Sequence, residues 1–148
     1  MQVQEIMTKD VLTVRPQTTV REVAELLVSH KISGLPVVDD VGKLVGIISE
    51  GDLMSKEILP EPPAELCILG AVIYYSGLKE YQEAFARMAA NTAEQLMTKT
   101  VVTAKAYDDV SDVARLMRDR HIKRVPVLDD EGHLIGIVSR QDIVKMLL

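Results

Sequence analysis

The chain has 148 residues, of which 47% are hydrophobic and 26% are charged, and its formal net charge is −5. This balance is typical of a folded globular protein and excludes disordered and collagen-like classes. The acidic charge and the absence of tryptophan argue against a broad nucleic-acid-binding surface. The longest apolar stretch, residues 66–75, is about half the length that spans a bilayer.

The single cysteine, Cys67, cannot form an internal disulfide, which is typical of a reducing compartment. We interpret Cys67 as a small buried apolar residue, because neither a histidine nor a second cysteine stands near it in the sequence. The N-terminus shows no charged-then-apolar leader. These features predict a cytoplasmic protein without a membrane segment.

The first 58 residues predict a β-α-β-β-α unit. Pro16 ends the first strand, Thr18 or Thr19 caps the first helix, and two strongly apolar strands follow. In chain order we expect a lead-in turn at 3–8, a strand at 11–14, a helix from about 19 to 30, strands at 34–38 and 44–48, and a helix at 50–58.

Acidic turns join the paired strands, at residues 39–42 and again at 129–132. Aspartate and glycine are common in such turns because they supply local hydrogen bonds and positive φ angles. The turns lack the alternating oxygen ligands of a calcium loop. We therefore expect no metal at either turn.

A segment of different character, residues 59–92, separates the two halves. Three prolines at its start end the first half, residues 64–75 are apolar, Gly77 is a breaker, and residues 78–88 are amphipathic. This pattern predicts a helical hairpin. Its apolar surface must be buried somewhere, and we favour a contact in a homodimer over docking of an unrelated partner.

The second half repeats the first at a constant offset of 90 residues. Roughly 20 of the 48 aligned pairs between residues 6–53 and 96–143 are identical, with no gap. The sequence therefore predicts three segments: a first repeat at 1–58, an insertion at 59–92 and a second repeat at 93–148.

This duplicated unit resembles the CBS domain pair, also called a Bateman module. The resemblance rests on the Met-Thr lead-ins at 7–8 and 97–98, the Pro-Val strands at 36–37 and 126–127, and the Ser-x-x-Asp endings at 49–52 and 139–142. It covers residues 3–58 and 93–148. It implies an α/β (α+β) fold whose two repeats pack about a pseudo-twofold axis, and two clefts that in many members hold AMP, ADP, ATP or S-adenosylmethionine.

Each Ser-x-x-Asp sequence stands where a strand becomes a helix and has two interpretations. A capping box explains the spacing at any helix start. A carboxylate held at a helix N-terminus can also accept both hydroxyls of a ribose, while the helix end favours a nearby phosphate. Both interpretations can hold for one residue.

The two repeats differ in charge. Lys123 and Arg124 precede a buried strand, where a cation requires an anion, whereas the first repeat has Ser33 and Gly34. We expect Lys123 and Arg124, with Arg140 as a third cation, to bind the phosphate of a nucleotide whose ribose Asp142 holds. The alternative is that these cations pair with acidic groups of a partner subunit.

The cleft of the first repeat, with Ser49 and Asp52, is expected to be weaker: empty, occupied by a less charged adenosine compound, or completed by cations from the second repeat. The expected ligand-binding residues are Lys123, Arg124, Val125, Pro126, Ser139, Arg140, Asp142, Thr103, Ser33, Gly34, Pro36, Ser49, Asp52 and Thr13.

An enzyme is not expected, because no nucleophile motif, metal-ligand spacing or glycine-rich phosphate loop is present. The sequence favours a regulatory adenine-nucleotide sensor that forms a homodimer and acts through a separate effector protein. Two alternatives stay open: a dimeric interaction module with vestigial clefts, and an S-adenosylmethionine binder that uses the uncharged cleft.

Overall fold

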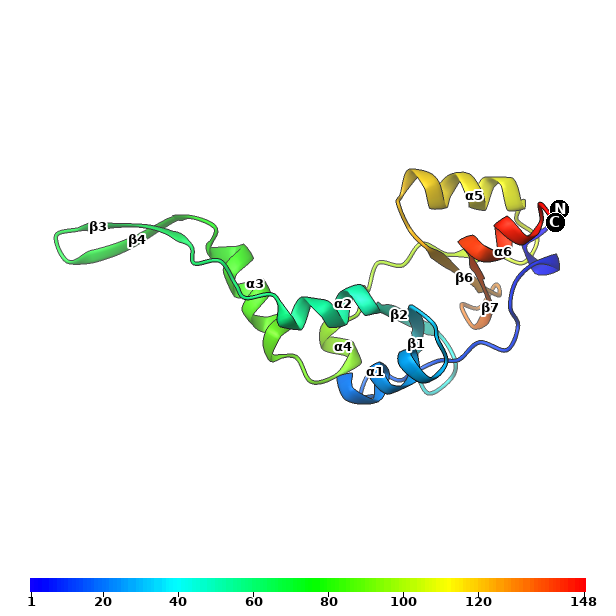
Figure 1. Ribbon diagram of the computed structural model, residues 1–148, viewed down its shortest axis with the longest axis horizontal. Helices are drawn as coiled ribbons and strands as arrows, with labels where there is room; N and C mark the ends of the chain where they lie inside the picture. Colours follow the sequence, from blue (N-terminus) through cyan, green and yellow to red (C-terminus); the bar gives the residue numbers. More distant parts are fainter.

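The computed structural model describes residues 1–148 and contains two similar units with a projecting arm between them (Figure 1). The first unit contains one β-hairpin and helices on either side of it. Its elements are α1 (Val20–Ser29), β1 (Gly34–Val38), β2 (Leu44–Ser49), α2 (Glu50–Met54) and the short helix η2 (Ser55–Glu57). Strand β1 pairs with β2 in an antiparallel register that joins Gly34 to Ser49. The expected strand at 11–14 is reduced to one parallel bridge between Val14 and Val37.

The second unit repeats this arrangement with the same register, in which Arg124 pairs with Ser139. Here the strand before the first helix forms two residue pairs, Ala104 with Val127 and Lys105 with Leu128, and runs parallel to the strand that it pairs with. Its elements are β5 (Ala104–Lys105), α5 (Val110–Asp119), β6 (Arg124–Leu128), β7 (Leu134–Ser139) and α6 (Arg140–Lys145). The expected α+β fold of two tandem repeats is confirmed.

The lead-in segment at the start of each repeat packs in the core of the other repeat's unit. The short helix η1 (Val3–Glu5) places Val3, which is 0% exposed, in the hydrophobic core of the second unit. In return, α4 (Ala93–Leu96) places its buried residues in the core of the first unit. Beyond these helices, Thr8 pairs with Ile137 of β7, and Thr98 pairs with Ile47 of β2. Each hydrophobic core therefore contains residues from the lead-in of the other repeat.

The acidic turns also meet across the pseudo-twofold axis. The amide of Leu44 donates to the carbonyl of Gly132 at 3.3 Å, and the amide of Leu134 donates to the carbonyl of Gly42 at 3.1 Å. Gly42 and Gly132 have φ angles of 85° and 89°, as their turns require. Reciprocal hydrogen bonds of this kind fix the relative position of the two hairpins.

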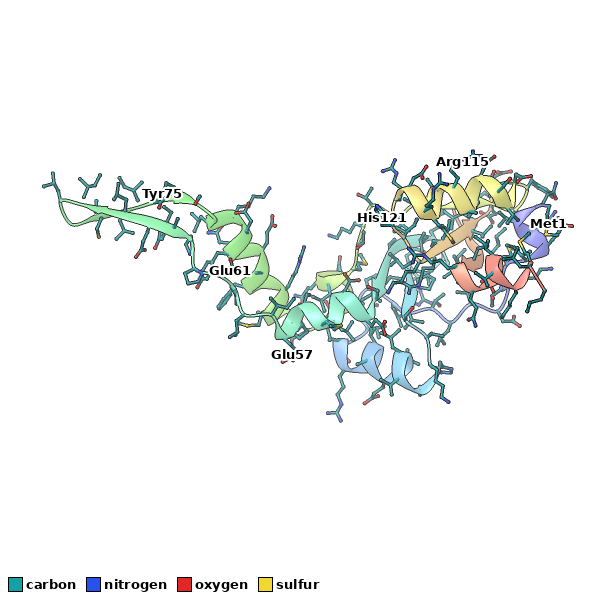
Figure 2. The ribbon with its side chains drawn as sticks, turned by 45° about the horizontal axis from the view of Figure 1, so that its top comes forward. Met1, Glu57, Glu61, Tyr75, Arg115 and His121 are labelled. Atoms are coloured by element: carbon teal, nitrogen blue, oxygen red, sulfur yellow. The ribbon has the colours of Figure 1, made fainter.

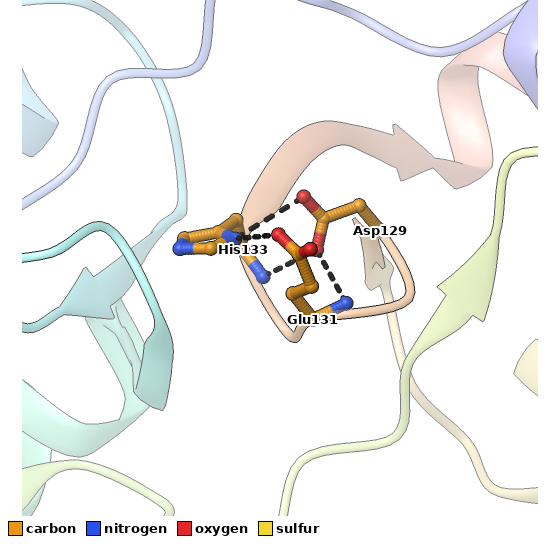
Figure 3. A group of neighbouring side chains, drawn as sticks. All are labelled: Asp129, Glu131 and His133. Carbon is orange, nitrogen blue, oxygen red and sulfur yellow. Dashed lines mark hydrogen bonds and ion pairs between the residues drawn. The ribbon is translucent and has the colours of Figure 1, made fainter.

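Asp129 organises the turn of the second unit. Its carboxylate accepts hydrogen bonds from the amides of Glu131 and His133 at 2.9 and 2.8 Å, and Asp39 accepts from the matching amides of its own turn. The local hydrogen-bonding role expected of these aspartates is confirmed. Figure 3 shows that His133 also joins Asp129 and Glu131 in a group whose ligand atoms lie within 4.8 Å of one another. The sequence did not indicate this grouping, and the absence of a metal here stays a prediction.

Asp129 should contribute to stability in a pH-dependent way. The hydrogen bond from the His133 amide lowers the pKa of Asp129 below its ordinary value of 3.8. A lowered pKa means that the contribution is present above the unfolded value and is lost as pH falls through the folded value. We expect Asp129→Asn to lower the melting temperature slightly at pH 6, and the difference from wild type to shrink as pH falls below 3.8. A difference that persists unchanged at low pH would contradict this.

The segment between the repeats corrects our prediction of a helical hairpin. Residues expected to form its first helix instead form a β-hairpin of β3 (Ala64–Ile68) and β4 (Ala71–Ser76), followed by α3 (Leu78–Ala89). Valine, isoleucine and tyrosine dominate β4, and such residues favour strands over helices. A short apolar run does not by itself distinguish the two. The second predicted helix is confirmed as α3.

Cys67 lies on this hairpin and is exposed, so its interpretation as a buried residue is wrong. The base of α3 is fixed to the first unit, because the ammonium group of Lys56 in η2 donates to the carbonyls of Met88, at 2.9 Å, and Ala90. None of the helices is long and apolar enough to cross a membrane.

Candidate functional site

A cleft of about 910 Å³ lies between the two repeats and has the size of a small-molecule site. The first repeat contributes its lead-in and the start of β1, and the second contributes the start of α6 and one arginine. The polar residues that line the cleft are Thr8, Asp10, His30, Lys31, Ser33, Glu50, Arg124, Ser139, Gln141, Asp142 and Lys145.

Asp142 stands in this cleft at the N-terminus of α6. Its Oδ2 atom accepts from the Ser139 amide and the Ser139 hydroxyl, both at 2.7 Å, while the Asp142 amide donates to Ser139 Oγ at 3.3 Å. This capping box fixes the side chain. Both bonds accepted by the carboxylate use Oδ2, so Oδ1 is available to a ligand hydroxyl. The capping and ligand-binding interpretations of Asp142 are therefore compatible.

Arg124 crosses from the second repeat to the first. Its guanidinium donates to the hydroxyl of Ser33 and lies against Gly34, where a Cβ atom would overlap it. Burial lowers the pKa of Arg124, and the carboxylates of Glu50 and Asp52 act in the opposite direction. Arginine stays protonated in proteins, so a half-buried cation stands at the edge of the cleft. Gly34 is what makes room for it.

The end of α1 adds a second cation. Lys31 follows the helix C-cap with a φ of 52°, and the amides of Lys31 and Ile32 donate to the carbonyls of Val28 and Leu27. This is a Schellman motif, in which glycine or asparagine is usual at the position of Lys31. Lys145 lines the cleft from α6. Three cations thus line the cleft, together with the carboxylates of Asp10, Glu50 and Asp142.

The structure groups the predicted site residues differently from our expectation. We expected Asp142 to share a site with Lys123, Arg124 and Arg140. Of these three cations only Arg124 lines the cleft with Asp142, together with the first-repeat strand. Lys123 is exposed outside the cleft lining, and Arg140 donates to the carbonyl of Ile122 at 3.0 Å. Predicted residues that line the cleft together are Ser33, Gly34, Pro36, Arg124, Ser139 and Asp142.

The remaining predicted residues lie elsewhere. Val125 and Pro126 are fully buried in the core of the second repeat. Ser49 and Asp52 form a matching capping box at the start of α2, with the Ser49 amide donating to Asp52 Oδ2 at 2.8 Å. Thr13 lines a separate depression beside Glu22, and Thr103 is exposed.

Sequence reasoning missed Lys31 and Lys145 as residues of the cleft. Neither lysine was among the predicted ligand-binding residues. No local sequence signal places them there, because the cleft depends on the exchange of lead-ins between the repeats. The alternative in which second-repeat cations complete the first-repeat cleft matches the position of Arg124.

The fold and the cleft define a tandem-repeat module with a ligand-sized site between its halves. The family model for the CBS domain matches residues 3–58 and 93–148. The chain belongs to the CBS domain family, as the motifs indicated. It is 36% identical to the uncharacterized protein MJ1426 of Methanocaldococcus jannaschii, over 100% of this chain and 92% of that one. It is 31% identical to chloroplastic CBSX1 of Arabidopsis thaliana, of which it spans 63%.

Solved structures give the same result. CBSX2 of Arabidopsis thaliana, in complex with AMP, matches with a TM-score of 0.77 and 30% identity, over 99% of this chain and 95% of that one. The CBS domain pair of protein MJ0100, in complex with 5′-methylthioadenosine and S-adenosyl-L-methionine, matches with a TM-score of 0.73 and 31% identity, over 99% and 95%. Two relatives with this fold therefore bind adenosine compounds: anionic AMP in one, and the sulfonium S-adenosyl-L-methionine with 5′-methylthioadenosine in the other.

Proposed function

We propose that this protein is a regulatory sensor that binds AMP, ADP or ATP in the cleft between its repeats, without catalysing a reaction. The observation that carries the proposal is the placement of Arg124 and Asp142, from one repeat, beside the strand of the other repeat. A fixed carboxylate can accept ribose hydroxyls, and a half-buried guanidinium can bind a phosphate. AMP in the complex of the related CBSX2 supports this choice.

A second candidate ligand is S-adenosylmethionine. The carboxylates of Asp10 and Glu50 also line the cleft and could face a sulfonium cation. The ligands of the MJ0100 domain pair support this alternative. A vestigial cleft is the third candidate, in which the charges serve only to hold the repeats together.

A nucleotide in this position would contact both repeats at once. It would therefore favour the relative arrangement of the repeats in which its contacts are best made. An effector protein that binds one arrangement better than the other would then bind more or less tightly as the nucleotide concentration changes. Arg124 links the repeats directly, since its backbone belongs to the second repeat and its guanidinium donates to Ser33 of the first.

Thermal unfolding with a ligand panel tests the proposal. AMP, ADP, ATP, S-adenosylmethionine and 5′-methylthioadenosine are each added at about 1 mM, and a ligand at a hundred times its Kd should stabilise the protein by about 2.7 kcal/mol. We expect the phosphorylated compounds to raise the melting temperature most. In Arg124→Ala, the AMP shift should fall well below that of wild type, while the 5′-methylthioadenosine shift should change less.

Lys123→Ala is the matched control, because Lys123 is the neighbouring cation and lies outside the cleft lining. It should leave every shift unchanged. No shift with any adenosine compound, in protein shown to be folded, would overturn the nucleotide proposal and favour a vestigial cleft. Shifts confined to S-adenosylmethionine would replace it with the second candidate.

A further inference from the structure

Gly34 and Arg124 occupy equivalent positions in the two repeats. They are 90 residues apart, and each begins a strand and pairs with a serine, Ser49 in the first repeat and Ser139 in the second. The guanidinium of Arg124 nevertheless lies against Gly34, in the region where side chains of the two repeats meet next to His121 in Figure 2. Equivalent residues that touch lie at the pseudo-twofold axis, so a single arginine crosses that axis, in one direction only.

The position of Arg124 requires that residue 34 lack a side chain. A Cβ atom on Gly34 would lie 2.5 Å from Cζ and 2.9 Å from Nε of the guanidinium, well inside van der Waals contact. The φ angle of Gly34 is not positive, so its backbone would accept alanine. Gly34 is therefore needed by the arginine of the other repeat and not by its own strand.

Ser33 holds the guanidinium in this position, because its hydroxyl accepts a hydrogen bond from Nη2 of Arg124. This is the only side-chain hydrogen bond that Arg124 makes, whereas a guanidinium has five N–H donors. The remaining donors belong to a half-buried cation at the edge of the cleft and are available to a phosphate.

Arg124 also decides the balance of charge in the cleft. Three carboxylates and three cations line it when histidine is counted as neutral: Asp10, Glu50, Asp142, Lys31, Lys145 and Arg124. Without Arg124, three carboxylates would face two cations. Charges interact more strongly where water is partly excluded, so the loss would change a cleft that accepts an anion into one that favours a cation.

We propose that Gly34 is a specificity-determining residue: by leaving room for Arg124, it makes the cleft select a phosphorylated nucleotide over a cationic adenosine compound such as S-adenosylmethionine. Gly34 is a positioning residue, since it acts through the guanidinium and not by contact with the ligand. The inference rests on the proposed function, because it names what sets the charge class of the ligand in the same cleft.

Calorimetric titration of AMP, S-adenosylmethionine and 5′-methylthioadenosine into wild type and Gly34→Ala tests this inference. In Gly34→Ala the Cβ atom displaces the guanidinium, so the Kd for AMP should rise at least about tenfold, as the loss of a charge-assisted contact implies. The Kd for 5′-methylthioadenosine, which has no phosphate, should stay within about twofold of the wild-type value. The Kd for S-adenosylmethionine should not rise.

Gly51→Ala is the matched control in the same repeat. A Cβ atom on Gly51 would lie 3.6 Å from Ser49 Oγ, an ordinary van der Waals contact, and Gly51 does not line the cleft. All three Kd values should stay unchanged in this variant. The double variant Gly34→Ala/Arg124→Ala should bind AMP no more weakly than Arg124→Ala alone, because Gly34 acts only through the arginine.

Ser33→Ala is a milder second variant, because it keeps the space at residue 34 and removes only the hydrogen bond that holds the guanidinium. It should weaken AMP binding by about threefold and leave 5′-methylthioadenosine unchanged. Should Gly34→Ala not fold, Ser33→Ala decides the inference by the same three titrations.

Equal weakening of all three compounds in Gly34→Ala would show that the Cβ atom distorts the cleft, and it would overturn the inference. An unchanged Kd for AMP in both Gly34→Ala and Ser33→Ala, or an additive loss in the double variant, would overturn it as well. Failure of wild type to bind AMP would overturn the proposed function itself and the inference with it. That outcome is visible before any variant is measured, so the two failures are distinguishable.

Discussion

Replacing Ile48 by alanine should lower the free energy of unfolding by about 2–5 kcal/mol. Ile48 is 0% exposed in β2 and lies in the core of the first repeat. The loss combines the transfer free energy of the removed methyl groups with the cost of the cavity that remains. Denaturant unfolding measures it, with Val28→Ala as the control, because Val28 is 78% exposed and should change the value by less than about 0.5 kcal/mol.

The same experiment tests whether the repeats unfold together. Met117, buried in α5, belongs to the core of the second repeat. If the exchanged lead-ins couple the two cores, Met117→Ala should shift the same single transition that Ile48→Ala shifts. Two transitions, each moved by one variant only, would contradict the coupling.

Val3→Asp should lower the free energy of unfolding by about 3–5 kcal/mol, because it buries a carboxylate without a partner. Val3 is near the N-terminus but lies in the core of the second repeat. Amide exchange should therefore accelerate first in β6 and β7, and less in β1 and β2. Gln2→Asp adds the same charge at an exposed position of the same turn and should be close to neutral.

A pattern in which Val3→Asp loosens β1 and β2 first would contradict the exchange of lead-ins. A loss of unfolding free energy in Val3→Asp no greater than that in Gln2→Asp would also contradict it.

Local signals in the sequence were sufficient for most of the fold. The spacing of apolar residues predicted α1 and its counterpart α5, and the Asp-Asp-x-Gly turns predicted both long hairpins. Ser139 and Asp142 form the capping box that their spacing indicated. These features depend on neighbours within a few residues, which is why one sequence reveals them.

What the sequence did not reveal depends on contacts between distant segments. Nothing near Val3 indicates that it packs in the second core, and nothing near Asp142 indicates that its cleft is completed by Ser33 and Gly34. The apolar run of β4 was taken for a helix because apolar residues alone do not distinguish the two, and the β-branched and aromatic composition that favours a strand was not weighed. Arg124 was expected either to serve its own repeat or to complete the first-repeat cleft, because the sequence alone does not show which repeat a long side chain contacts.

Calorimetric titration of AMP into Asp142→Ala and Asp52→Ala tests the proposed site most directly. The two residues are equivalent in the repeats and make matching capping boxes, so both variants should lose about the same stability, about 1 kcal/mol. Only Asp142 lines the cleft that contains Ser33 and Gly34. We predict that Asp142→Ala weakens AMP binding at least tenfold while Asp52→Ala leaves it within about twofold, as the loss of a charge-assisted hydrogen bond implies. Equal weakening in both variants, or weakening in Asp52→Ala alone, would contradict the site.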